Sequence, residues 1–225
     1  MSAMSVPIIP ASPVDLASLP LRMRKLPLDA RGYPVPWFVA WVEGVPEFRI
    51  MDVAKWVLAV KERRCWVCGE SLGRWLAFPI GPMCAITRTT SEPPSHRECA
   101  LWSLANCPFL SNPQMVRRSE HLPPEAERPA GLPIMRNPGV VCLWITREYE
   151  TWPTEDQRRL ITVGVPSEVT WWREGRRATR AEVQESIDTG MPALLETAKL
   201  QGPFAVEALA KQVGRLSVLL PPEAP

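Results

Sequence analysis

Two pairs of potential metal ligands stand out in this sequence. Cys65 and Cys68 form a Cys-x-x-Cys motif that Gly69 follows at once, and His96 and Cys99 form a second pair at i and i+3. Two thiolates separated by two residues can grip one ion, and a glycine relieves the backbone just after such a turn. The spacing therefore predicts a Zn²⁺ site with the ligands Cys65, Cys68, His96 and Cys99.

A shell of three cysteines and one histidine is closed and tetrahedral, which is the structural type of zinc site and leaves no position for water activation. Spacing alone leaves the fourth ligand open, because Cys84 or Cys107 could replace His96. We interpret Cys142 as a core thiol, since free cysteine is among the most buried residue types. A thioredoxin-like redox pair would follow a strand and open a helix, whereas this Cys-x-x-Cys follows a predicted helix.

The elements that must position these ligands can be predicted from the intervening residues. Two β-rich runs, 75–80 and 83–86, flank Gly81-Pro82 and predict a hairpin. Ser95 and Glu98 have the spacing of a capping box, which predicts that a helix begins there and holds the second ligand pair on its first turn. A knuckle, a hairpin and then a ligand-bearing helix is the order of a treble clef.

Strands and helices are also expected on both sides of this module. Before it, the runs 38–42 and 48–50 predict a β-hairpin, and Asp52 is expected to cap a helix that ends near Arg63. After it, the run 139–146 predicts a buried strand and 159–165 its partner, both continuing the sheet of the first hairpin. Three helical segments are then expected: a short one capped by Ser167, one from a Thr179–Glu182 capping box to about Asp188 where Gly190 and Pro192 interrupt it, and one at 204–219.

Together these elements predict an α+β fold, with a small mixed or antiparallel sheet, packed helices and an embedded treble-clef-like zinc module. The 26 prolines and 10 tryptophans predict short elements joined by long connections. Four regions are expected: an irregular lead-in at 1–36, the hairpin, helix and zinc module at 37–111, a Pro-rich connection at 112–138, and strands followed by helices at 139–225.

Basic residues gather around the cysteines. Residues 55–118 contain nine bases and four acids, a net charge of +5, whereas the whole chain has +2. Arginine can neutralise phosphate and exposed tryptophan can stack on bases, so Trp66, Trp75 and the nearby arginines are candidate contacts for a nucleic acid or an acidic protein. The arginines are Arg63, Arg64, Arg74, Arg88 and Arg97. The alternative is a solvated basic face, since +5 is small for a dedicated nucleic-acid-binding protein.

The sequence predicts a cytoplasmic protein without a membrane span. No run approaches the roughly 20 apolar residues that a span requires, and residues 1–20 lack a charged region followed by a clean apolar one. In the cytoplasm, cysteines serve as metal ligands or buried thiols more often than in disulfides.

Several segments resemble a family of uncharacterised proteins found in phage and bacterial genomes. These are Cys65–Gly69 with Leu72-Gly73, Gly81–Cys84, Glu92–Ala100, Cys107–Leu110 and Gly175–Val183. The resemblance implies a mobile-element context and supports the cysteine module as one unit. It implies no activity.

The sequence favours a zinc-stabilised binding or interaction protein over an enzyme. HNH nucleases often place a treble clef beside their catalytic site, but they need a histidine base on the hairpin, and this chain has only His96 and His121. In zinc deaminases a His-x-Glu motif precedes a Pro-Cys-x-x-Cys motif, whereas here the Cys-x-x-Cys comes first and His96-Arg97-Glu98 follows it. Two alternatives stay open: an enzyme of unrecognised type with Cys84, Arg97 or Glu98 lining a cleft beside the zinc module, and a factor that acts by occupying a host partner.

Overall fold

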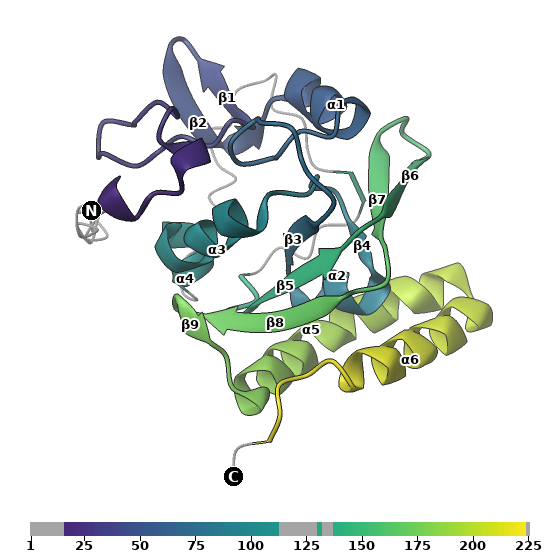
Figure 1. Cartoon of the computed structure of the whole chain (residues 1–225). Coiled ribbons are helices and arrows are strands. Elements are labelled where there is room, and N and C mark those ends of the chain that lie inside the picture. Colours follow the sequence, from purple (N-terminus) through teal and green to yellow (C-terminus); the bar gives the residue numbers. More distant parts are fainter. Residues whose placement is uncertain (1–15, 113–129, 132–136, 224–225) are drawn as a thin grey trace, which may run out of the picture.

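A computed structural model describes residues 16–112, 130–131 and 137–223 of the chain (Figure 1). Within these residues, antiparallel sheets of four, three and two strands are surrounded by helices, so the predicted α+β class is confirmed. The strands are β1 Val39–Val42, β2 Val45–Met51, β3 Leu76–Ile80, β4 Thr89–Thr90, β5 Val141–Thr146, β6 Tyr149–Pro153, β7 Arg159–Val163, β8 Glu168–Arg173 and β9 Arg176–Arg177. The helices are α1 Val53–Lys61, α2 Pro82–Thr87, α3 Arg97–Asn106, α4 Pro108–Ser111, α5 Arg180–Gln201 and α6 Pro203–Ser217, with short 3₁₀ turns at Leu16–Ser18 and Leu21–Met23.

The four-stranded sheet has the order β3-β5-β8-β9 and forms the centre of the molecule. Every residue of β5 is buried, because helices cover both faces of this sheet. Leu143 and Ile145 face α3 and pack with Ala100 and Leu104, whereas alternate residues face α2, α5 and α6 (Figure 1). The sheet is therefore the middle of three layers.

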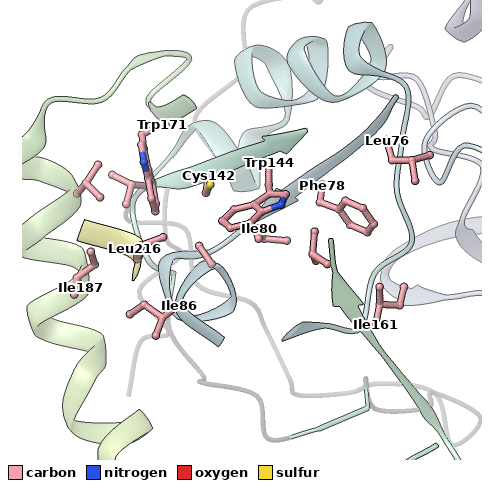
Figure 2. Close-up of a cluster of buried hydrophobic side chains, with 14 of the residues drawn as sticks. Leu76, Phe78, Ile80, Ile86, Cys142, Trp144, Ile161, Trp171, Ile187 and Leu216 are labelled. Atoms are coloured by element: carbon pink, nitrogen blue, oxygen red, sulfur yellow. The ribbon is translucent and has the colours of Figure 1, made fainter. Parts of the chain in front are cut away.

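The larger core lies between the sheet and the second group of helices. Figure 2 shows Trp144 between Phe78 on one side and Ile86, Leu216 and Trp171 on the other. The buried indole N–H of Trp144 donates to the carbonyl oxygen of Gly164 over 2.9 Å, so its burial leaves no polar group unpaired.

The expected hairpin at 38–50 is confirmed as β1 and β2, but it forms a sheet of its own. The prediction that it begins the central sheet is wrong. Helix α1 follows with Asp52 as its N-cap, whose carboxylate accepts a hydrogen bond from the amide of Lys55 over 3.1 Å, as expected.

The second predicted hairpin is wrong. Residues 76–80 form β3, but Pro82–Thr87 form the helix α2. Pro82 opens this helix, where the backbone N–H that proline lacks would have no intrahelical acceptor. Strand β3 pairs with β5 instead, with Leu76 opposite Thr146 and Ile80 opposite Cys142. The order of a treble clef is therefore replaced by a knuckle, the edge strand β3 of the central sheet, the short helix α2 and then α3.

Three predictions for the last third of the chain also need correction. Strand β7 pairs with β4 and β6 in the second sheet rather than with β5. The segment after Ser167 is the strand β8, which pairs with β5. The capping box of Thr179 and Glu182 is confirmed, but α5 continues through Gly190 and Pro192 to Gln201. The helix expected at 204–219 is confirmed as α6.

The β3–β5 pairing joins regions 37–111 and 139–225 in one sheet, while the four-region division stays a prediction. Most of the connection 112–138, including His121, lies outside the described residues. Within the described ranges, the helices are all too short or too polar to cross a bilayer.

Candidate metal centre

Cys65, Cys68, His96 and Cys99 converge at one point on the side of α3 that faces the N-terminal segment. One ligand atom from each side chain lies within 4.8 Å of the other three, and all four residues are buried. All six cysteines are free thiols, so no disulfide competes for these sulfur atoms. Residues that are 34 positions apart in the chain thus form one compact donor set that could hold a metal ion.

The first pair is held by a tight loop of the knuckle type. The amide of Gly69 donates to the carbonyl of Cys65 over 2.8 Å, and the amide of Cys65 donates to the carbonyl of Glu70 over 2.7 Å. The amide of Cys68 points at the Cys65 sulfur, 3.4 Å away. Backbone N–H groups aimed at a sulfur favour its thiolate form, which is the form that binds metals.

Gly69 is required at this loop for two reasons. Its φ of +76° is in the left-handed region, which glycine adopts without steric cost. A Cβ at this position would lie 2.7 Å from the ring of Trp37. The amide of Trp37 in turn donates to the carbonyl of Val67 over 2.7 Å, so the indole is fixed directly against the loop.

The second pair comes from the start of α3. His96 is the N-cap residue of this helix, and its Nδ1 lies 3.4 Å from the Cys68 sulfur and 3.9 Å from the Cys99 sulfur. Its Nε2 lies 3.0 Å from the carbonyl oxygen of Ser71. An Nε2–H that donates to this carbonyl leaves the Nδ1 lone pair facing the sulfurs, which is the usual outer support of a metal-binding histidine.

The predicted capping box at Ser95 and Glu98 is wrong. Ser95 pairs with Ala77 of β3 through two backbone hydrogen bonds of 2.8 and 3.0 Å. This bridge fixes Ser95 beside β3. The amide of the next residue, His96, points at the Cys65 sulfur over 3.3 Å. The central sheet thereby sets where the second ligand pair begins.

The electrostatics of the four groups are strongly coupled. Burial acts to raise the pKa of Cys65, but hydrogen bonds from Cys68, Cys99 and His96 outweigh it and hold that pKa far below its usual value. Hydrogen bonds to Cys65 and Cys68 raise the pKa of His96 to about 10. Hydrogen bonds to the same two thiols, followed by burial, raise the pKa of Cys99. One thiolate is thus favoured and a second is disfavoured, and a bound cation would offset their repulsion.

The N-terminal segment closes the outer side of the cluster. Leu19, Met23 and Leu26 pack on the cysteines, together with Trp37 and Trp102. Arg22 extends this cover with ion pairs to Glu70 (2.7 Å), just after the knuckle, and to Glu98 (3.0 Å), on the first turn of α3. The sequence pattern of residues 1–36 shows no sign of this role, because the contacts are long-range.

The other cysteines lie apart from the donor set. Burial raises the pKa values of Cys84 (to about 11), Cys107 and Cys142, so these thiols stay protonated. Among the described residues, the alternative with Cys84 or Cys107 in place of His96 is not the arrangement found.

The structure engages most of the arginines that were candidates for anion binding. Arg88 donates to the carbonyl of Val163 over 2.6 and 2.9 Å, and Arg97 pairs with Glu168 over 2.7 Å. Arg64 pairs with Glu62 over 2.7 Å. Arg63 and Arg74 stay exposed. The candidate Trp66 is buried and stacks on Phe38 with ring centres 4.9 Å apart, so it offers no surface to a ligand.

The residues suggested for an enzyme are also used elsewhere. Arg97 and Glu98 are in the ion pairs described above, and Cys84 is a protonated thiol at pH 7.

Comparison of the chain with models of known protein families, with curated proteins and with solved structures finds no match. The resemblance to uncharacterised phage and bacterial proteins stays a prediction. What the structure establishes is a buried cluster of three thiols and one imidazole with the composition of a metal site.

Proposed function

We propose that this chain is a zinc-stabilised binding protein in which Cys65, Cys68, His96 and Cys99 hold one structural Zn²⁺. The observation that carries the proposal is the convergence of the four ligand atoms within 4.8 Å. In a tetrahedral site with Zn–S of about 2.3 Å and Zn–N of about 2.0 Å, a sulfur and a nitrogen are about 3.5 Å apart. The distances of 3.4 and 3.9 Å from His96 Nδ1 to two sulfurs bracket that value.

The donor set favours zinc over harder cations, because thiolate and imidazole ligands suit Zn²⁺ whereas Mg²⁺ and Ca²⁺ prefer oxygen. Four protein ligands fill the tetrahedron, so the ion would fasten the fold and would not activate water. It would join the knuckle to α3 and, through the cover of Leu19, Met23 and Leu26, to the N-terminal segment. A reducing cytoplasm would keep the thiols available.

The role of binding protein follows from this closed shell and from the exposed basic residues beside it. Its partner would be anionic, either a nucleic acid or an acidic protein. The resemblance to phage and bacterial proteins suggests that the gene belongs to a mobile element. A protein that acts by occupying a host molecule would suit such an element.

Metal analysis of the purified chain tests the zinc site. We expect one zinc per chain in the wild type and a loss of that zinc in Cys65→Ser and Cys99→Ser. Cys84→Ser and Cys107→Ser are matched controls and should keep full occupancy. A metal-free wild type, prepared without chelator, would rule the proposal out. Zinc loss in Cys84→Ser or Cys107→Ser, with His96→Ala retaining it, would instead show a different ligand set.

A further inference from the structure

Trp75 is an exposed tryptophan that has two arginines beside its ring. Its exposed fraction is 44%. The guanidinium carbon of Arg147 lies 4.6 Å from the centre of the indole, and that of Arg74 lies 5.6 Å away. Both arginines are exposed, and in the part of the chain that the structure describes neither guanidinium has a carboxylate or carbonyl partner. Their N–H donors are therefore available to a ligand.

The central sheet builds this arrangement. Leu76 at the start of β3 is opposite Thr146 at the end of β5, and Trp75 and Arg147 each stand one step beyond this pair, just outside the two strands. Directly opposite residues of antiparallel strands approach within about 5.5 Å. Arg74 is the chain neighbour of Trp75. The three side chains are thus brought together by strand register, not by chance contact of long flexible residues.

Two other arginines of the region already have partners, whereas Arg63 stays exposed. Arg88 and Arg97 are tied to Val163 and Glu168. The nearest acidic residue along the chain is Glu148, which follows Arg147 and is exposed. Trp75, Arg74 and Arg147 therefore place an exposed indole beside two positive charges that have no ion-pair partner among the described residues, at one edge of the sheet.

We propose that Trp75, Arg74 and Arg147 form a binding surface for single-stranded nucleic acid. Unpaired bases can stack on the indole and on the planes of the guanidiniums, whose outward N–H groups can bind the phosphates. This inference rests on the proposed function as a binding protein and names its partner. The indole separates the candidates: an acidic protein offers charge without a base to stack, and a duplex hides its bases.

A short stretch of chain links the metal centre to this surface. Ser71, whose carbonyl is 3.0 Å from Nε2 of His96, stands four residues before Trp75. The chain between them includes Gly73, and a Cβ added to this glycine would meet nothing within 4 Å. A ligated His96 would hold the first end of this stretch and β3 would hold the other, which limits the freedom that the surface must lose on binding.

Fluorescence anisotropy of labelled oligo(dT) and oligo(U), titrated with the full chain at low salt, tests the proposal. Trp75→Ala should weaken binding about 5- to 150-fold, the range for loss of one base–aromatic stack. Arg147→Ala and Arg74→Ala should each lower the slope of log affinity against log salt by about 0.7. Glu148→Gln should strengthen binding, and Trp75→Phe should retain more of it than Trp75→Ala.

The chain offers matched controls in the second sheet. Trp152 is 42% exposed, and its indole N–H donates to the Thr162 hydroxyl over 3.0 Å. Arg159 is exposed but donates to Thr151. Trp152→Ala and Arg159→Ala should bind as the wild type does. Circular dichroism and zinc content would verify that each variant is folded.

Three results would overturn the inference: no binding at low salt, equal affinities of Trp75→Ala and Trp152→Ala, or equal binding of a duplex or of polyglutamate. Zinc is measured on the same preparations. Zinc-loaded protein that binds no oligonucleotide removes this inference alone. Zinc-free protein removes the proposed function, while the comparison of Trp75→Ala with Trp152→Ala still decides this inference.

Discussion

At the scale of single residues, Gly69 allows two distant parts of the chain to meet. Its left-handed φ turns the knuckle back, and its missing side chain leaves room for the ring of Trp37. Gly44 has a similar φ of +78° in the β1–β2 turn, but a Cβ there would meet nothing within 4 Å. The two positions therefore separate the cost of the backbone conformation from the cost of the close approach.

We expect Gly69→Ala to destabilise the protein by about 3 kcal/mol, and Gly44→Ala by about 1 kcal/mol. A left-handed alanine costs about 1–2 kcal/mol, and displacing a packed ring adds about 1–3 kcal/mol. Urea unfolding of the zinc-saturated proteins measures both values. Equal losses in the two variants would mean that Trp37 moves aside freely and does not constrain the knuckle.

The four candidate ligands could be identified from the sequence because their spacing is local within each pair. The residues that hold these ligands in place could not be identified in this way. Ser71 contributes only a carbonyl oxygen, which no residue type reveals, and Trp37 contacts the knuckle from outside the module. Arg147 lies more than 70 positions from Trp75 and comes beside it only through the register of β3 and β5. Sequence patterns carry no such register.

At the scale of elements, α5 contains a proline that the sequence pattern marks as an interruption. Pro192 lies inside the helix and is exposed. A proline there removes the hydrogen bond to the carbonyl four residues earlier and crowds that turn. The helix continues because Ile187 and Ala198, on either side of the proline, are both buried against the core and α6. Tertiary packing therefore overrides the local preference.

Pro192→Ala should stabilise the protein by about 1–3 kcal/mol, because alanine restores the missing hydrogen bond at an exposed helical site. Pro203→Ala is the matched control: Pro203 opens α6, where the amide needs no partner, so its replacement should change stability little. Thermal unfolding followed by circular dichroism measures both. A lower stability of Pro192→Ala would show that the proline's kink is needed for the packing of α5.

The other element predictions failed for a related reason. The residues of α2 form a short apolar run, and those of β8 a short run with two tryptophans; runs of this length fit a strand or a helix equally well. Neighbours decide the outcome: β5 supplies a pairing edge to β8, whereas α2 packs between α5 and α6 and the sheet. Asp52 and Thr179 are N-caps as their local spacing predicted, whereas Ser95, with the same spacing to Glu98, is paired with the backbone of Ala77 instead.

At the scale of the whole molecule, the metal centre and the central sheet have distinct but adjoining buried clusters. The cluster of Leu19, Met23, Leu26 and the cysteines contains no strand, whereas the larger core joins three strands of the sheet to α2, α5 and α6. Trp37 and Leu72 pack against both clusters and connect them. The smaller core has little apolar area of its own, so its stability should depend on the bound ion.

Removal of the metal should therefore loosen one end of the molecule before the other. Bound zinc supplies folding free energy to a segment that lacks enough core, and regions with few apolar contacts open first. After chelation, hydrogen–deuterium exchange should rise in residues 16–26, 65–72 and the first turn of α3, and the fluorescence of Trp102 should change. Exchange in α5 and α6 should stay at its original rate, because their contacts lie in the larger core.

Cys65→Ser should already show the loosened pattern, and chelator should not change it further. Uniform acceleration along the chain would mean that both cores unfold as one cooperative unit, and zinc added back should then restore both together.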